Sequence, residues 1–261
     1  MSSLFIKKLD ILSTFVKIKL VKTSDYIRDK IERLPKGYVF TYDDFITEVN
    51  KKEAIIKALN RMAASGKIEK LAKGKFYKPE VSVFGTLQPN QYQTVRDLLE
   101  VDGKTVGYLT GYSIYNQLGL TRQISNTIQI GKNEVRPRFK RDRYTISFIK
   151  QKNTITKENI PALQLLDAIR YIKKIPDTSI SSACTRFLAI VRELDDKQKM
   201  TLVRLVQKYS PATRALLGAL LEEIGEKEIL NTLQKSLNPI TNYKLSGANK
   251  VLSVTENWNI R

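Results

Sequence analysis

The stretch from Ser24 to Pro79 constrains the fold more than any other part of the chain. Apolar residues spaced by three or four positions predict three short helices, over residues 24–34, 42–49 and 53–64. Two β-prone segments that can pair across a tight turn follow, at residues 67–71 and 75–78. This order of helices and hairpin predicts a winged helix-turn-helix.

Short local signals set the ends of these helices. Pro35 and Gly37 stop the first helix, and Thr41 with Asp44 three residues later is typical of a capping box that opens the second. Gly66 is expected to end the third helix in the left-handed conformation that glycine adopts without steric cost.

The third helix is expected to bury its apolar face and to present a polar face outward. In a helix-turn-helix this helix enters the major groove, where arginine pairs with guanine, asparagine with adenine, and lysine neutralises phosphate. The predicted DNA-binding residues of this helix and of the hairpin tip are Lys51, Lys52, Lys57, Asn60, Arg61, Lys73 and Lys75. An ordinary solvated face on a protein-docking module is the alternative.

The remaining chain predicts an α+β protein. Residues 80–88 are expected to be a linker. A mixed α/β unit over residues 87–160 combines helices at 89–100 and 108–118 with strands at 127–130 and 144–149. Leucine-rich stripes predict consecutive helices over residues 161–261. The predicted organisation is an N-terminal extension at 1–23, a winged domain at 24–86 and a second domain at 87–261.

Helix-end signals also occur in this helical part. Ser181 or Ser182 is expected to cap one helix, and Ser210-Pro211 to open another that ends at Gly225. The paired carboxylates Asp195-Asp196 and Glu222-Glu223 are predicted to be surface charges. Trp258 is expected to anchor the tail.

A second basic segment lies between the two predicted strands, in an expected loop at residues 136–143. It could grip phosphates or an acidic protein, with Phe139 as a stacking ring, or it could be a solvated loop that blunts a sheet edge. The basic residues of this second patch are Arg136, Arg138, Lys140, Arg141 and Arg143.

Composition limits the chemistry that the chain can perform. Its 45 Lys and Arg against 26 Asp and Glu give a net charge of +19, which favours a polyanionic or acidic partner. With no histidine and one cysteine, an intrachain disulfide, Cys/His zinc sites and histidine-based triads are excluded. Cys184 is therefore expected to be a core residue. We expect that the protein is not an enzyme and that it binds no cofactor and no metal.

A metal-dependent nuclease is a remote alternative. Gln129 and Lys132 beside Glu134 are weakly similar to the carboxylate-and-lysine hairpin of such enzymes. Their spacing does not match the spacing that binding of Mg²⁺ by that hairpin requires.

The first 23 residues are basic and apolar. Lysines interrupt every apolar run, so neither a signal peptide nor a membrane span is expected, and the protein is predicted to be cytoplasmic. A helix that packs on the winged module or on a second copy is favoured here over a helix lying on a membrane surface, and a poorly ordered extension is a further alternative.

Several motifs together resemble the AbiEi-type antitoxin family. They include Lys36-Gly37-Tyr38-Val39-Phe40-Thr41, Ala58-Leu59-Asn60-Arg61-Met62 and Lys73-Gly74-Lys75-Phe76-Tyr77-Lys78-Pro79. The resemblance continues in Tyr108-Leu109-Thr110-Gly111-Tyr112-Ser113 and Leu118-Gly119-Leu120-Thr121-Arg122-Gln123. It covers most of residues 24–150, the helical remainder more loosely, and not the N-terminal extension.

The resemblance implies the antitoxin of a type IV toxin–antitoxin pair, an abortive-infection system of phage defence. Its winged domain would bind double-stranded operator DNA and repress its own operon. Its C-terminal part would counteract a nucleotidyltransferase-like toxin, with or without direct contact. Binding of the operator as a monomer, as a dimer or cooperatively is left open.

Overall fold

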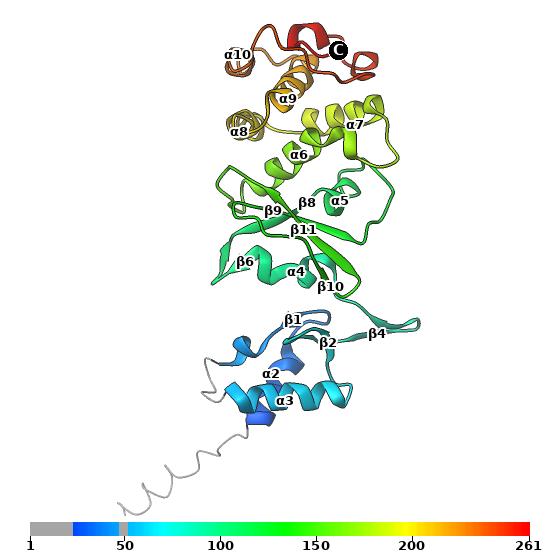
Figure 1. Ribbon diagram of the computed structural model, residues 1–261, viewed down its shortest axis with the longest axis vertical. Coiled ribbons are helices and arrows are strands. Elements are labelled where there is room, and N and C mark those ends of the chain that lie inside the picture. The colour runs from blue at the N-terminus through cyan, green and yellow to red at the C-terminus, as the bar shows by residue number, and fades with distance from the viewer. Residues whose placement is uncertain (1–22, 47–51) are drawn as a thin grey trace, which may run out of the picture. The chain divides into compact units, whose positions relative to one another are not determined.

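A computed structural model describes residues 23–46 and 52–261 (Figure 1). The chain is a mixed α+β protein that divides into two compact units, and the division falls between Thr94 and Val95. We name them the N-terminal unit and the C-terminal unit.

The N-terminal unit combines helices with a small antiparallel sheet. Its elements are α2 (Thr23–Arg33), β1 (Val39–Phe40), the 3-10 helix η1 (Tyr42–Phe45), α3 (Lys52–Ala64), β2 (Glu69–Ala72) and β3 (Lys75–Tyr77). The sheet has the order β1-β3-β2, so β1 pairs with the second strand of the hairpin. The helices at 24–34 and 53–64 and the hairpin are thus confirmed.

Other expectations for this unit have mixed outcomes. The predicted capping box is present, because the Thr41 amide donates to the Asp44 carboxylate at 2.7 Å and the Asp43 amide donates to the Thr41 hydroxyl at 3.2 Å. The expected helix at 42–49 appears as η1 through Phe45, and residues 47–51 lie outside the described part of the chain.

The expected linker at 80–88 is wrong in part. Residues Glu80–Ser82 and Gly85–Leu87 form a second hairpin, β4 and β5. Gly85 has a φ of +104°, a conformation that only glycine adopts easily, and it lets the chain reverse. Val83 and Phe84 at its tip are almost fully exposed.

The C-terminal unit is built on a four-stranded sheet of order β10-β11-β9-β8. Its strands are β8 (Gly107–Thr110), β9 (Thr127–Lys132), β10 (Phe139–Arg141) and β11 (Tyr144–Lys150). The central pair β9 and β11 is parallel, whereas β8 and β10 pair antiparallel at the edges.

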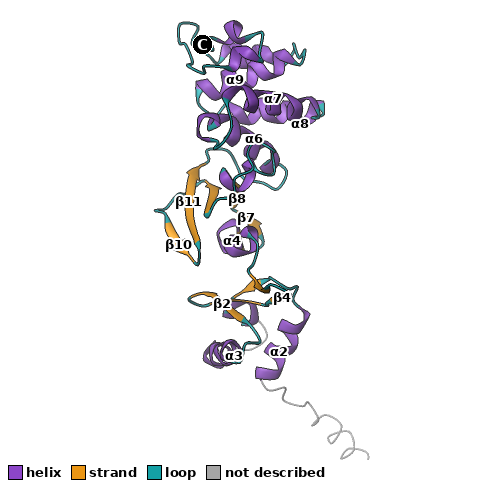
Figure 2. Cartoon of the chain, turned by 90° about the vertical axis from the view of Figure 1, so that its right-hand side faces the viewer, coloured by secondary structure: helices purple, strands orange, loops and turns teal. Residues whose placement is uncertain are grey.

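Helices cover both faces of this sheet (Figures 1 and 2). On one face lies α4 (Gln91–Leu99), whose Val95, Leu98 and Leu99 pack with sheet residues such as Ile128 and Ile146. A two-stranded hairpin, β6 (Glu100–Val101) and β7 (Lys104–Thr105), follows α4. On the other face lie α5 (Tyr112–Tyr115) and the helical layer.

Two expectations in this unit are corrected. Residues 108–110 form strand β8 instead of the start of a helix, because Tyr108, Leu109 and Thr110 pair with β9 and Gly111, with a φ of +59°, separates them from α5. The expected loop at 136–143 contains strand β10, which makes a tight hairpin with β11.

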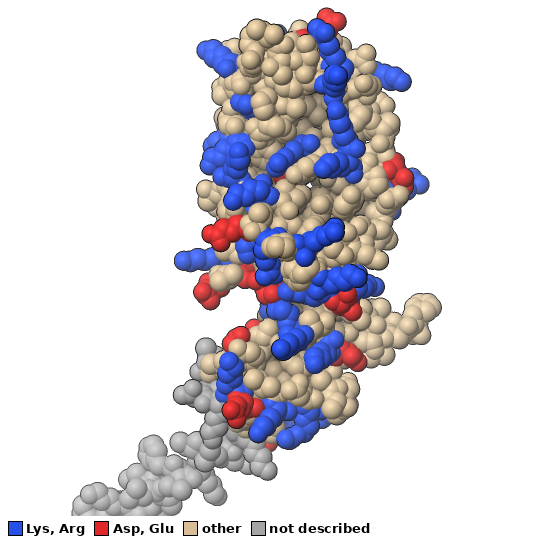
Figure 3. Space-filling model, in the orientation of Figure 1, with Lys and Arg blue, Asp and Glu red and all other residues tan. Residues whose placement is uncertain are grey.

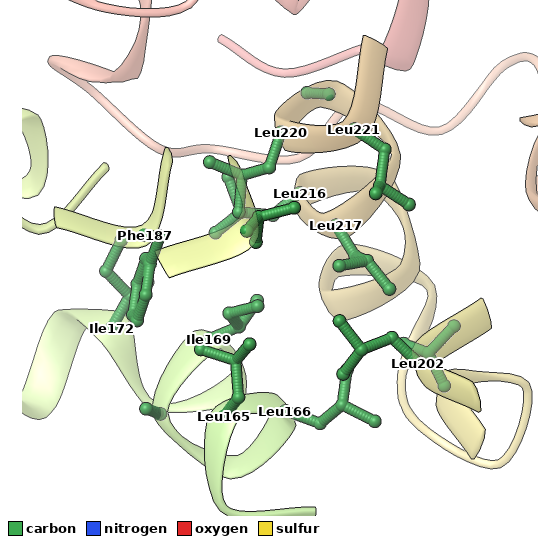
Figure 4. Close-up of a cluster of buried hydrophobic side chains, with 14 of the residues drawn as sticks. Leu165, Leu166, Ile169, Ile172, Phe187, Leu202, Leu216, Leu217, Leu220 and Leu221 are labelled. Carbon is green, nitrogen blue, oxygen red and sulfur yellow. The ribbon is translucent and has the colours of Figure 1, made fainter. Parts of the chain in front are cut away.

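The C-terminal part is helical, as expected. Its helices are α6 (Ile160–Arg170), η2 (Ile172–Lys174), α7 (Ile180–Arg192), α8 (Asp196–Val206), α9 (Pro211–Glu223), α10 (Leu230–Lys235), η3 (Ala248–Lys250) and η4 (Thr255–Trp258). Their leucine stripes meet in one large core (Figure 4). Within the described ranges, every helix falls short of the length and apolarity that crossing a bilayer would require.

Caps decide where these helices begin. The cap of α7 is Ser179 and not Ser181 or Ser182, since the Ser179 hydroxyl accepts from the Ser182 amide at 3.0 Å. Asp195 is more than a surface charge, because its carboxylate accepts from the Gln198 amide and caps α8. Pro211 opens α9, as expected.

The tail is fixed by α9. Trp258 is fully buried, and its indole N–H donates to Glu222 at 2.5 Å, while Glu223 accepts from the Ser253 amide at 2.7 Å. The predicted anchor is confirmed, and both glutamates are tail ligands instead of free surface charges. Gly218 makes room for the indole, since a Cβ there would lie 2.1 Å from the Trp258 ring.

We expect Gly218→Ala to lower the free energy of unfolding by about 1–3 kcal/mol, because an added methyl group overpacks this contact. The overlap is with the six-membered ring of the indole. In a Trp258→Phe background that overlap is relieved, so the same substitution should cost less. Urea unfolding of the wild type, of each single variant and of the double variant measures this coupling. Equal costs of Gly218→Ala in both backgrounds would contradict the contact.

A buried carboxylate joins the sheet to the helical layer. Asp167 of α6 is fully buried and accepts hydrogen bonds from Tyr108 at 2.8 Å, Thr110 at 2.8 Å and Tyr209 at 3.0 Å. The Gln151 amide donates to both tyrosine hydroxyls at 2.8 Å, so each hydroxyl can give its own proton to Asp167.

Burial raises the pKa of Asp167, whereas the three hydrogen bonds and the charge of Arg170 lower it; burial is the larger effect. A carboxyl group with a raised pKa binds its proton more tightly in the folded chain. Its contribution to stability is therefore complete below the pKa of the unfolded chain and is lost as the pH rises through the folded value.

We expect Asp167→Asn to cost about 1–3 kcal/mol at acid pH, because its amide opposes hydroxyl donors. The wild type should lose stability relative to this variant as the pH rises above about 4, since asparagine does not ionise. Urea unfolding between acid and neutral pH checks this, with the exposed Asp196→Asn as control. If the cost of Asp167→Asn grew as the pH rose, the pKa of Asp167 would be lowered in the folded chain and not raised.

Candidate nucleic-acid interface

One face of α3 is packed and the opposite face is open. Ile55, Ala58 and Leu59 are buried against a core that includes Ile27, Phe40 and Phe45. The exposed face of α3 carries Glu53, Lys57, Asn60 and Arg61. Their spacing of four, three and one residues places them on one side of the helix. The burial that fixes α3 therefore also orients its polar residues to solvent.

A lysine begins α3. Lys52 is exposed, and its Nζ lies 4.7 Å from the centre of the Tyr42 ring, a cation–π contact with η1. Lys51, a predicted DNA ligand, lies outside the described residues.

The end of α3 leads directly into the hairpin. The Lys67 amide donates to Met62 and the Gly66 amide to Ala63, and Gly66 has a φ of +71°. This is the predicted left-handed helix end.

The hairpin tip presents lysine to solvent. Gly74, at a φ of +71°, closes the turn, where Lys73 is exposed and Lys75 is half-buried. Phe76 on β3 points into the core and holds the hairpin against the helices. Lys67 and Lys70 are exposed as well and were missed, although their place within the predicted strand at 67–71 was a usable signal. Basic side chains gather over α3 in Figure 3.

The second basic patch belongs to the C-terminal unit, on the β10–β11 hairpin. Four of its five predicted residues are exposed: Arg136, Arg138, Lys140 and Arg143. Arg141 is only 7% exposed and makes two hydrogen bonds to the Asp97 carboxylate on α4, at 2.6 and 3.1 Å. Strand alternation turns Arg141 inward, so the prediction that it belongs to an exposed patch is wrong.

Phe139 is not a free stacking ring. It stacks on Phe148 with ring centres 6.3 Å apart, and the Arg136 guanidinium lies 4.5 Å from its centre. The hairpin thus uses its aromatic residue within the fold and presents arginine and lysine outward.

We expect Arg141→Ala to lower the free energy of unfolding by about 1.5–3 kcal/mol, the range for hydrogen bonds to a charged group. Arg138 lies directly before β10, and its side chain is exposed. Arg138→Ala should therefore leave the melting temperature unchanged. Thermal denaturation by circular dichroism compares the two. Equal losses would contradict the different roles of the two arginines.

Two of the three residues considered for a nuclease have structural partners. The Gln129 side chain accepts from the Tyr112 amide at 3.2 Å, and Lys132 donates to the Leu98 carbonyl at 3.2 Å. Glu134 is exposed. Over residues 23–46 and 52–261, no three His, Cys, Asp or Glu side chains gather as metal ligands would. Cys184 is fully buried, and burial raises the pKa of its thiol to about 11.

Comparison with known proteins places the chain in a family. A family of unknown function, DUF6088, matches residues 26–200, which span both units. The chain belongs to this family. No curated protein matches it.

A solved structure resembles the fold of this DUF6088 member. It is the crystal structure of the RV2827C protein from Mycobacterium tuberculosis, with 16% sequence identity and a TM-score of 0.53. The likeness covers 86% of this chain and 83% of that one. At this identity it shows a shared fold and nothing about activity.

Proposed function

We propose that the N-terminal unit is a winged helix that binds double-stranded operator DNA through α3. The observation that carries the proposal is the exposed face of α3, where Lys57, Asn60 and Arg61 lie opposite the buried residues. Arginine and asparagine are the side chains that pair with guanine and adenine edges, and lysine neutralises phosphate. In this arrangement α3 is the recognition helix.

The β2–β3 hairpin is the wing of this proposal. Lys73 at its tip, with Lys67 and Lys70 nearby in the sequence, suits the phosphates beside the groove that α3 enters. Lys52, held over Tyr42, adds a cation at the start of the helix. The pairing of β1 with β3 ties the wing to the helices and fixes its direction.

The wider role follows from the resemblance to AbiEi-type antitoxins. We infer that the protein is a cytoplasmic autorepressor and antitoxin without enzymatic activity. Its C-terminal unit counteracts a nucleotidyltransferase-like toxin. The support for this part is the set of shared motifs and the net charge of +19. A nucleotidyltransferase gene beside its own, and rescue of growth when both are expressed, are the observations that test it.

We expect Lys57→Ala/Arg61→Ala to weaken binding of the upstream operator about 10-fold or more, because an arginine–base pairing is worth about 1–3 kcal/mol. Lys57→Ala alone should reduce the slope of log affinity against log salt by about 1. Gel shifts over a salt series measure both effects.

Arg33→Ala/Lys36→Ala is the matched control, since it removes two exposed cations of the same unit away from α3. It should retain sequence-specific binding. Unchanged operator binding by the α3 variant would rule out α3 as the recognition helix. Binding of a neighbouring gene product with no DNA shift at low salt would favour the alternative, a basic interaction protein.

A further inference from the structure

The C-terminal unit contains a group of basic cavities that the sequence does not reveal. A cavity of about 510 Å³ lies between the end of α6, the start of α9 and the tail. Its basic lining residues are Arg170, Lys173, Lys174 and Lys244. Apolar residues such as Ile172, Leu216 and Leu245 also line it. This combination suits a ligand with a charged side and a flat, apolar side.

Two further cavities share residues with the first. One of about 310 Å³ shares Arg170 and Ser210 with it and adds Lys150, Lys152 and Lys208. The other, of about 200 Å³, shares Tyr171 and Lys174 and is lined by Tyr112 and Tyr115. We name this set of three neighbouring cavities the basic channel. Among the described residues, no aspartate or glutamate lines any of them.

The cations of the basic channel are exposed. The Arg170 guanidinium and the Lys174 Nζ lie 4.9 and 5.3 Å from the centre of the Tyr171 ring, which keeps both at the cavity edge. Lys173 and Lys174 are both exposed on η2, where Ile172 is the buried residue. Within the described part of the chain, none of Arg170, Lys173, Lys174 and Lys244 forms an ion pair.

Two polar features of the first cavity add to this charge. Tyr243 lines it, and its hydroxyl group is buried without a hydrogen-bond partner among the described residues. Rotation of the Tyr243 ring toward the cavity would let this hydroxyl group donate to a ligand acceptor. The first residues of α9, a helix of 13 residues, line the same cavity and contribute the positive end of its dipole.

We propose that the basic channel binds single-stranded nucleic acid. Successive phosphates lie along the cations from Lys152 through Arg170 to Lys174, and a base enters the tyrosine-lined end beside Tyr112. A positively charged groove that ends on aromatic rings is the usual design for binding single strands. Cavities that share lining residues lie next to one another, which suits a ligand with several phosphates better than a single nucleotide.

The site is separate from the proposed operator interface. It lies within the C-terminal unit and uses none of the residues of α3 or of the β2–β3 hairpin. Figure 3 shows that Lys and Arg outnumber Asp and Glu on the drawn face of this unit. A single strand bound here could be RNA or DNA, which share the phosphate and base chemistry that the channel recognises.

The test uses fluorescence anisotropy of the full chain at low salt with three labelled probes: a 12-nucleotide oligo(U), oligo(dT) of equal length, and a 12-base-pair duplex. The wild type should bind at least one single strand. Lys173→Glu/Lys174→Glu should weaken that binding about 10-fold or more. Lys197→Glu/Lys235→Glu makes the same change in net charge at exposed sites of the same unit and should weaken it far less.

Two further measurements distinguish binding in the basic channel from binding elsewhere on the protein. Lys57→Ala/Arg61→Ala should keep its single-strand affinity, so failure of the operator proposal and failure of this one are distinguishable. Ultraviolet cross-linking to oligo(U) with 4-thiouridine should label peptides that contain residues 169–174 or 242–245. Equal losses in both charge-reversal variants, cross-links elsewhere, or displacement of the strand by an equal concentration of ATP would overturn the proposal.

Discussion

The carboxylate of Asp167 is the constraint on which the C-terminal unit depends. It is buried where α6 crosses the sheet. It accepts hydrogen bonds from Tyr108 and Thr110 on β8 and from Tyr209 after α8. A buried charge without these donors would be costly, so the sheet and the helices must meet in one register. Gly131 contributes, because a Cβ there would lie 2.3 Å from the Tyr108 ring.

That register also places the surface features of the unit. Arg170 follows Asp167 by three residues, and its charge acts on the buried carboxylate while its side chain lines the basic channel. Tyr209 on the other side of the network precedes Ser210, which stands directly before α9 and lines two cavities of the channel. The channel is therefore assembled by the same packing that satisfies Asp167.

Much of the fold could be predicted from local signals. The periodic apolar residues gave α3 and the leucine-rich helices, and Gly66 and Pro211 marked helix ends correctly. The errors occurred where long-range pairing overrides local pattern. Tyr108–Thr110 join a sheet because β9 is available as a partner, and Phe139–Arg141 form an edge strand that pairs with β11. Arg141 is turned inward by that pairing and meets Asp97, 44 residues away.

The sequence by itself determined the basic character of the chain, its lack of histidine, and the exposed polar face of α3, because charge and helical period are local properties. Only the tertiary structure decided which distant cations share a surface. Lys150, Arg170, Lys208 and Lys244 lie on different elements, and no spacing along the chain connects them. They meet because the core beneath α6 and α9 packs in one way, and that packing depends on contacts between residues far apart in sequence.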